Sequence, residues 1–557
     1  MPMATTTRPD RAAWPGSTPR AVWRACLAAV LLGGACLGLT GPAQAQGVAR
    51  PAAVLIGPDG LPLDPAQRID AEAPPGVSQA YVVRPALQVR STTTNNISLA
   101  ASDAARADSV VVATPRLDAR INTPGLRLDA ALAADLVAYV GRSRADRIFP
   151  NARADATVQL LERLLFVDGS LSADTSTPNP FGLLDAPAQT VFTRSTTTRE
   201  RISPYIDREV GPDARLQLRT DHSWVQNEAG IATLGDARLS EQTGLYELRP
   251  QPLGLRLQGQ RQASTFSGSG ASDVTFTNAR VSLLYAVLSQ QLVLVATGGS
   301  DRGRYGSNDV SETVRGGGLI WTPSERTRLD LQAEKRFFGT GWNVNFSHRS
   351  PFLGIGAGLS QQATTYAAQV AALPAGADLT QLFDAMLSTR IANPAERAAA
   401  VQQLIAQRNL PTTLGSALNL FSATAQLQKS ANLSLALLGV RHTVTLRGFY
   451  ARTEDLIGKD LPPLISSDAR QYGSSLGLNR RLRPETTADF TLGRTRVVGF
   501  GANVGTRTSS NSVRLGLSQA FSPRTTATVS LSRLWIDSTV LADANQSSLS
   551  FGLLHRF

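Results

Sequence analysis

Long stretches of this sequence alternate between apolar and polar residues, and this alternation constrains the fold more than any other feature. In segment 126–140, leucine, alanine and valine occupy the even positions, and arginine and aspartate occur only at odd ones. Successive side chains of a β-strand point to opposite faces, so such a segment forms a strand with one apolar and one polar face. Segments 152–160 and 165–173 repeat the pattern. We therefore expect a chain built mainly of strands.

Two classes of fold accommodate such strands. After residue 45 the sequence contains no run of about 18 uninterrupted apolar residues, so the mature chain cannot cross a bilayer as a helix. An unpaired backbone amide in hydrocarbon costs several kcal/mol, which leaves a closed β-barrel as the way to span a membrane. An apolar fraction of 42% fits barrel strands, which are apolar on one face only. The alternative is a soluble sandwich in the periplasm.

Connections between the expected strands alternate between short and long. Short turns rich in proline, glycine or aspartate are expected at 123–125, 161–163, 211–213, 250–254, 289–291, 323–326, 483–484 and 522–525. Long polar loops are expected at 94–108, 176–194, 454–469 and 536–544. Outer-membrane barrels show this asymmetry, with short turns toward the periplasm and long loops outside the cell. A soluble sandwich has no reason to show it.

The strand count completes the fold prediction. From Tyr81 to Phe557 the alternating segments number about 22, within a range of roughly 18–22, and an even number puts both ends of the barrel in the periplasm. Trp321 and Phe521 precede short turns, as in the aromatic belts of membrane proteins, although a chance scatter of aromatics is the alternative. We predict an all-β, transmembrane, antiparallel outer-membrane β-barrel over residues 78–557.

Residues 1–45 are expected to form an export signal. Basic residues precede an apolar stretch at 25–39, and Ala43-Gln44-Ala45 supplies a small-residue cleavage site. A lipoprotein signal at Cys36 is the alternative, but Gly33 stands where such a signal has leucine. Residues 46–77, rich in proline, glycine and alanine, are expected to form a periplasmic tail.

Composition limits the expected partners and chemistry. Both cysteines, Cys26 and Cys36, lie in the predicted signal, so the mature chain is expected to lack disulfides and thiolate metal ligands. The excess of 55 basic over 43 acidic residues can indicate nucleic-acid binding, but export to the envelope argues against nucleic acid as a partner. The four histidines have no metal-binding spacing to one another or to carboxylates. No metal and no cofactor is predicted.

Residues 365–418 interrupt the strands with helical periodicity. Apolar residues fall on one stripe in 378–387, and a second helix over 393–405 has Asn393 as N-cap and Glu396 to complete a capping box. By strand count this short two-helix insertion lies on the exterior side, where it can cover the mouth, enter the lumen as a plug, meet a partner, or pack on itself without specific function. The candidate plug or gate residues are Leu382, Phe383, Met386, Val401 and Leu404.

One motif suggests hydrolysis, and its geometry argues against it. Asp221-His222-Ser223 contains the residue types of a catalytic triad, but neighbours on a strand point to opposite faces, so Asp221 cannot easily orient His222. No catalytic residue is predicted and the chain is expected not to be an enzyme. A hydrolase embedded in a barrel is the alternative.

Two sets of residues are expected on the inner face of the barrel. Gly354, Gly356 and Gly358 are followed by no helix, which argues against a nucleotide site, and they are expected to leave room for something inside, such as the insertion. Arginines on polar faces are expected to line the lumen, where they either form an anion-selective path or stabilise the wall by pairing with acids. They are Arg116, Arg120, Arg127, Arg153, Arg215, Arg219 and Arg328.

The last thirteen residues, NQSSLSFGLLHRF, form a final alternating segment that ends on phenylalanine. This segment resembles the C-terminal signature of bacterial outer-membrane β-barrels, from which His555 departs because an apolar residue is usual there. The resemblance implies that the barrel assembly machinery recognises Phe551, Leu553 and Phe557. It also implies a location in the Gram-negative outer membrane, in contact with its lipid and lipopolysaccharide.

Several stretches resemble the PEP-CTERM system-associated outer-membrane protein family. They are LLFVDGSLS at 164–172, ISPYI at 202–206, KRFFGTGW at 335–342 with SHR at 347–349, and NPAER at 393–397 running to Leu410-Pro411. The resemblance covers most of the chain from Tyr81 onward and implies a barrel that serves an exosortase and exopolysaccharide export system as conduit or scaffold. Components of that system are then the expected partners. A general diffusion porin is the alternative function.

Overall fold

The computed structural model of the chain describes most of the residues after residue 80. The described residues are 81–176, 195–227, 236–267, 273–288, 291–371, 425–456 and 468–557, with positions 383, 384, 386–388, 391, 397, 400 and 401. The predicted export signal and periplasmic tail lie outside them.

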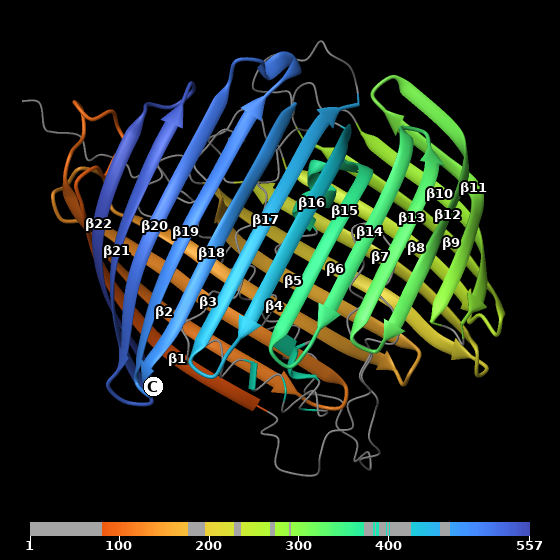
Figure 1. The fold of residues 1–557 in the computed structure, drawn as a ribbon, viewed down its shortest axis with the longest axis horizontal. Helices are drawn as coiled ribbons and strands as arrows, with labels where there is room; N and C mark the ends of the chain where they lie inside the picture. The colour runs from red at the N-terminus through yellow and green to blue at the C-terminus, as the bar shows by residue number, and fades with distance from the viewer. Residues whose placement is uncertain are drawn as a thin grey trace, which may run out of the picture. The chain divides into compact units, whose positions relative to one another are not determined.

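Over these residues the chain forms 22 β-strands (Figure 1). The first eleven are β1 (Tyr81–Thr94), β2 (Asp108–Asn122), β3 (Leu126–Tyr139), β4 (Arg147–Leu161), β5 (Leu165–Ser176), β6 (Ser195–Val210), β7 (Ala214–Asn227), β8 (Ala237–Leu248), β9 (Leu253–Phe266), β10 (Val274–Val287) and β11 (Leu292–Tyr305). The others are β12 (Asn308–Ser324), β13 (Thr327–Arg336), β14 (Gly339–Arg349), β15 (Leu353–Thr365), β16 (Ala425–Leu438), β17 (His442–Asp455), β18 (Ala469–Arg483), β19 (Thr486–Gly499), β20 (Arg507–Ala520), β21 (Thr525–Ser538) and β22 (Ala544–Arg556).

The strands form one closed antiparallel barrel. Each strand pairs with its neighbours in sequence, and β1 also pairs with β22, with Ala86 opposite Arg556 and Thr94 opposite Ser548. A closed ladder leaves no edge strand with unpaired amides, which is the condition for crossing hydrocarbon. The prediction of a closed antiparallel barrel of about 22 strands is therefore confirmed. The alternative of a soluble two-sheet sandwich is wrong.

Connections differ between the two ends of the barrel. At one end, β2 and β3 are joined by residues 123–125, and β16 and β17 by residues 439–441. At the other end, loop 95–107 joins β1 to β2, and the chain leaves β15 after Thr365 and re-enters the sheet at Ala425 of β16. We call these the short-turn end and the long-loop end. The C-terminus, marked C in Figure 1, lies at the short-turn end, where β22 finishes.

The long-loop end also has connections that break the predicted asymmetry. The connections 306–307 and 337–338 are as tight as those at the short-turn end. A short 3-10 helix, Gly501–Asn503, lies between β19 and β20 and was not predicted from the sequence. No helix in the described part of the chain is long and apolar enough to cross a membrane.

The outer face of the barrel is apolar, as β10 shows. Val281, Leu283 and Tyr285 are 50, 59 and 47% exposed, whereas the alternate residues Arg280 and Ser282 are 7 and 5% exposed. The same alternation runs around the wall and exposes further large apolar side chains, among them Leu87, Leu218, Leu257, Leu294, Trp321, Leu359, Leu446, Leu492, Leu531 and Phe551. An apolar exterior of this extent needs lipid around it. The barrel is therefore of the membrane-spanning kind.

Lipid contact predicts how the barrel responds to an added charge. Leu531 lies midway along β21 on the outer face and is 56% exposed. We expect Leu531→Arg to lower the free energy of unfolding by about 2–4 kcal/mol, because a cation near the membrane midplane loses its hydration. Ser530→Arg places the same charge on the opposite face of the same strand and is expected to cost much less. Urea unfolding in lipid vesicles measures both variants, and equal losses would contradict the assignment of faces.

Candidate functional site: the interior of the barrel

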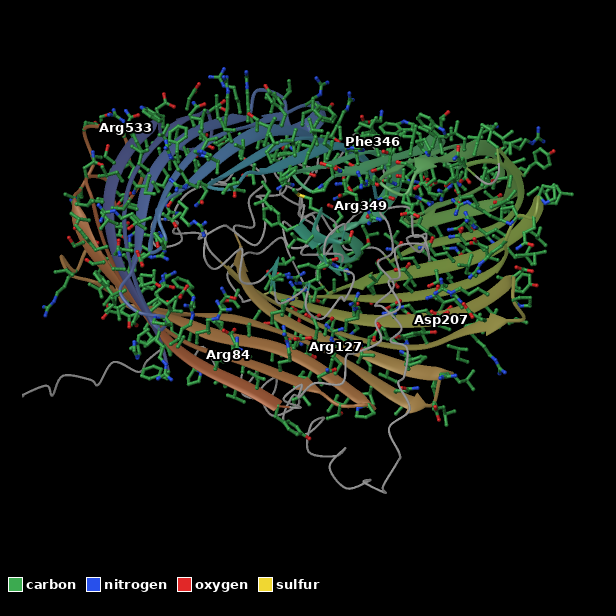
Figure 2. All side chains as sticks on the ribbon, turned by 60° about the horizontal axis from the view of Figure 1, so that its bottom comes forward. Arg84, Arg127, Asp207, Phe346, Arg349 and Arg533 are labelled. Atoms are coloured by element: carbon green, nitrogen blue, oxygen red, sulfur yellow. The ribbon has the colours of Figure 1, made fainter. Side chains whose placement is uncertain are left out.

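Helix α2 (Tyr366–Ala371) identifies the faces of the strands that point into the barrel. It begins directly after β15, yet it contacts β6, β7 and β8, which are far from β15 in the sheet. Its residue Ala367 is fully buried against Val225, Ala237 and Leu239. A helix this short reaches those strands only through the interior, and Figure 2 shows the teal helical ribbon inside the ring of strands. The faces that carry these residues are therefore the inner faces.

Helical residues later in the insertion pack on a different part of the inner wall. Phe383, Met386 and Val401 are fully buried, and they form one apolar cluster with Ala436 and Leu438 of β16. Because Leu438 is the last residue of β16, this cluster lies near the short-turn end. We use the word plug for helix α2 together with the described helical residues between 383 and 401. The plug contacts the inner wall both near the long-loop end and near the short-turn end.

Polar contacts hold the plug in place. Gln369 donates from Nε2 to Oε1 of Gln426 on β16 at 2.9 Å, and both side chains are buried. Arg397, whose side chain is 4% exposed, pairs through Nε with Oδ1 of Asp384 at 2.8 Å. Its Nη1 donates to the carbonyl oxygen of Ile391 at 3.0 Å. These bonds join the two helical stretches to each other and helix α2 to the wall.

The sequence predicted part of this plug. Phe383, Met386 and Val401 come together as one cluster, whereas Leu382 and Leu404 lie outside the described residues. Of the predicted two-helix insertion, the structure describes only short helical pieces. Helix α2 was missed, although Thr365 gave a signal for it as an N-cap: its Oγ1 accepts a hydrogen bond from the amide of Ala368 at 3.2 Å.

A second loop folds over the inner wall at the long-loop end. Ile97 of loop 95–107 is fully buried against Val110, Val137 and Tyr139, which lie on the inner faces of β2 and β3. Arg144 of the next loop donates to the carbonyl oxygen of Ile97 at 3.3 Å, and burial lowers the pKa of this guanidinium. This loop and helix α2 narrow the same end of the barrel.

One part of the inner wall is charged and tightly paired. On β5 and β7, Arg219 bridges Asp168 and Asp221, with both N–O distances at 3.0 Å, and its guanidinium lies 4.9 Å from the ring centre of Tyr205. All three charged side chains are at most 11% exposed. Further pairs join Arg215 to Asp207, Arg280 to Glu334 and Arg336 to Asp301. We call the inner faces of β2 to β13 the charged arc; Figure 2 labels Arg127 and Asp207 on it.

All seven predicted arginines lie on the charged arc, and all seven pair with an acid. Arg116 pairs with Asp118, Arg120 and Arg127 with Asp129, Arg153 with Asp155, and Arg328 with Asp330, beside the pairs of Arg215 and Arg219 given above. Arg116, Arg120 and Arg153 have side chains 52, 60 and 56% exposed, so their pairs are accessible to water. Pairing of this kind favours wall stabilisation over an anion-selective lining.

The rest of the inner wall is lined mainly by hydroxyl and amide groups, which the sequence analysis missed. On the inner faces of β14 to β22 and of β1, hydroxyls bond to one another across strands. These pairs are Ser360 with Ser430, Thr495 with Ser510, Thr508 with Ser538, Ser532 with Ser548, and Thr92 with Ser550, at 2.5 to 2.8 Å. We call this part the hydroxyl arc. Serine and threonine at alternate positions, as in 525–532, were the available signal.

The structure brings together neither a catalytic triad at Asp221-His222-Ser223 nor, among the described residues, a metal site. Asp221 is buried on the inner face and bonded to Ser203 and Arg219, while His222 lies on the outer face beside Trp224, at 6.5 Å between ring centres. A triad through His222 and Ser223 is thus ruled out by strand geometry, as predicted. Among the described residues, no group of three His, Cys, Asp or Glu side chains is placed to hold a metal.

The inward glycines on β15 lie close to side chains of the neighbouring strand. Gly356 and Gly358 do face inward, but a Cβ at Gly356 would lie 3.0 Å from Oγ of Ser434. A Cβ at Gly358 would lie 3.0 Å from Nδ2 of Asn432. Side chains of β16 thus occupy space beside these glycines, and the room expected there for the insertion stays a prediction.

Comparisons with known proteins support no closer assignment than the fold. A comparison with models of known families finds no match, and a comparison with curated proteins finds none either. The siderophore receptor PirA from Pseudomonas aeruginosa is 11% identical, with 85% of this chain and 80% of that chain covered and a TM-score of 0.37. The outer membrane protein OpdK from the same organism is 10% identical, covering 86% and 99%, with a TM-score of 0.33. The FrpB iron transporter from Neisseria meningitidis is 9% identical, covering 86% and 83%, with a TM-score of 0.43.

The class of the protein follows from its own geometry. A closed antiparallel wall, apolar outside and polar within, defines a porin-like outer-membrane β-barrel. Here the interior also carries the plug.

The charged arc makes a stability prediction. We expect Arg219→Met to lower the free energy of unfolding by about 3–5 kcal/mol, because it leaves Asp168 and Asp221 buried without their partner. Arg153→Met removes an exposed pair and is expected to cost about 1 kcal/mol or less. Restoring neutrality with Asp168→Asn and Asp221→Asn is expected to recover part of the loss in Arg219→Met. Denaturant unfolding in bilayers measures all of these, and equal losses for the two arginine variants would refute the role assigned to burial.

Proposed function

We propose that this protein is a gated outer-membrane conduit, in which the plug closes the lumen and moves when a solute passes. The contacts of the plug with the inner wall carry this proposal. Helix α2 reaches β7 and β8, and Phe383, Met386 and Val401 pack on β16 near the other end. An insertion that contacts the wall near both ends of the barrel lies in the lumen, which is open in a general diffusion porin. With the short turns in the periplasm, as in other outer-membrane barrels, the plug enters from the exterior side.

The chemistry of the hydroxyl arc supports a polar, hydroxyl-rich solute such as a polysaccharide. Serine, threonine and amide side chains exchange hydrogen bonds with sugar hydroxyls as readily as with one another. The arc also carries inward charges, such as Arg447 on β17 and Asp489 on β19, and we expect an uncharged polymer to slide along the hydroxyl and amide groups between them. The charged arc is already neutralised by its own pairs and so does not attract ions strongly.

The place of the conduit in an exosortase and exopolysaccharide export system is part of this proposal. It comes from the sequence resemblance at 164–172, 335–342 and 393–397. The proposed partners are components of that export system, the barrel assembly machinery at the C-terminal strand, and the lipid and lipopolysaccharide of the outer membrane. A scaffold that transports nothing is an alternative within this proposal. The conductance experiment below distinguishes it from a conduit.

Removing the insertion tests the gate. Thr365 lies directly opposite Ala425 in the β15–β16 ladder, so a two-residue Asn-Gly turn can replace residues 366–424 without shifting the strands. In planar bilayers we expect low conductance from the full chain and a large, steady conductance from the shortened one. A full chain that already conducts as well as the shortened one would identify a general diffusion porin, and two closed proteins would favour a scaffold.

A point variant tests the same gate without a deletion. Phe383→Asp with Met386→Asp places charge in the buried cluster on β16 and is expected to raise the frequency of openings. Val540→Asp with Leu541→Asp makes the matched change in the exposed β21–β22 loop, where both residues are over a third exposed, and is expected to leave the openings unchanged.

Current block by sugars tests the substrate class. In the shortened chain we expect neutral oligosaccharides to interrupt the current. We expect Ser530→Ala, Ser532→Ala and Ser550→Ala together to shorten each block about tenfold or more, since each lost hydrogen bond is worth about 0.5–1.5 kcal/mol. Arg116→Gln with Arg153→Gln on the charged arc is the control and is expected to leave these blocks unchanged. Equal effects of the two variants would count against a saccharide path along the hydroxyl arc.

A further inference from the structure

A group of cations lies on the outer face of β16 to β19, on the side that contacts lipid. The same outer faces carry exposed apolar residues, such as Leu433 on β16 and Leu492 on β19, which are 43 and 44% exposed. All lie toward the long-loop end of their strands. We call them the outer cation patch: Lys429, Arg452, Arg470, Arg494 and Arg496.

The sheet register brings three of these cations into one row. Lys429 lies directly opposite Arg452, and Arg452 lies directly opposite Arg470. Like charges opposite each other on neighbouring strands repel, and they destabilise the pair of strands that carries them. The row therefore costs stability unless an anion lies against it.

Acids within the wall do not neutralise the patch. Glu454 is the carboxylate that pairs here, with Oε1 2.5 Å from Nε of Arg452 and 3.9 Å from Nζ of Lys429. Nε of Arg496 is buried and has no hydrogen-bond partner in the described part of the chain. Asp468 lies close enough to Glu454 to interact with it electrostatically, and two carboxylates beside five cations still leave a net positive surface at the lipid boundary.

An aromatic ring holds the guanidinium groups in place. Phe500 lies after β19, and its ring centre is 4.7 Å from the guanidinium carbon of Arg452 and 5.3 Å from that of Arg470. Cation–π contacts of this kind fix two like charges side by side in spite of their repulsion. Their donors are thus arranged before any ligand arrives. Arg533 of β21, two strands beyond β19, adds a further outward cation on the blue wall in Figure 2.

From this arrangement we infer that the outer cation patch binds the phosphate groups of a phosphorylated glycolipid in the leaflet at the long-loop end, an inference that rests on the membrane location and orientation given in the proposed function. Phosphate oxygens accept several charge-assisted hydrogen bonds from arginine at once. The apolar band on the same strands, with Leu433, Leu446, Leu478 and Leu492, continues directly below and receives the acyl chains. A ligand that is anionic above and apolar below is an amphiphile, and the site is therefore assigned to a membrane lipid and not to a soluble anion.

Binding of purified lipids tests the site. The full-length protein in detergent is titrated with lipid A, a glycolipid with two phosphates, with its dephosphorylated form, and with inorganic phosphate, and bound lipid is counted by native mass spectrometry. We expect tight binding of the phosphorylated lipid alone. Equal binding of the dephosphorylated lipid would overturn the role of the cations. Displacement of lipid A by millimolar inorganic phosphate would overturn the assignment to a lipid.

Variants localise the site. Lys429→Gln, Arg470→Gln and Arg496→Gln together keep the Arg452–Glu454 pair, and we expect lipid A to bind about tenfold more weakly or worse. Arg116→Gln, Arg120→Gln and Arg153→Gln remove the same number of charges from the inner face and are expected to leave lipid A affinity unchanged. Equal weakening in both triple variants would overturn the location.

A stability readout separates lost binding from lost folding. In lipid-free detergent the outer triple variant is expected to melt at the same temperature as the parent or higher, because the like-charge row is gone. Lipid A is expected to raise the melting temperature of the parent and not that of the variant. A variant that melts lower without lipid, or that gains as much from lipid A as the parent, would overturn the inference.

Discussion

The ladder between β1 and β22 is the interaction on which the rest of this structure depends. It joins residues more than 450 positions apart, as in the bond between the hydroxyls of Thr92 and Ser550. Without it the sheet would end in two edges whose amides have no partner in hydrocarbon. Closure also decides which face of every strand is inside, because a single register runs around the whole wall. That register therefore determines which residues form the two arcs, the docking site of the plug and the outer cation patch.

The interior joins two kinds of surface with different physical behaviour. On the charged arc, arginines and acids neutralise each other at distances near 3 Å, so this side is rigid and nearly neutral. On the hydroxyl arc, each serine or threonine donates and accepts, and its partner can be exchanged for water or solute at little cost. The plug binds between them through apolar contacts as well as hydrogen bonds. Apolar docking on Ala436 and Leu438 can be undone without separating charges, which suits the movement proposed for the plug.

The sequence predicted the barrel because period-two alternation is local and survives in every strand. It gave the strand number, the class of connections and the opposite facing of Asp221 and His222. It could not give the partners of the charged residues, since Arg219 and Asp168 are 51 positions apart and meet only through the register. The docking site of the plug was also hidden, because Ala436 differs in no way from other small residues of a strand. The side chain beside Gly356 was hidden for the same reason, because Ser434 reaches it from the next strand.

The point where the insertion leaves the wall has a consequence for how such barrels change. Thr365 and Ala425 face each other across one rung, so the cylinder is complete whether the intervening residues are many or few. A single in-frame gain or loss of coding sequence there can convert an empty cylinder into an obstructed one, or the reverse. The sequence of the insertion and that of the barrel wall can therefore diverge at different rates. Related barrels can share the same wall and yet differ in which solutes pass through them.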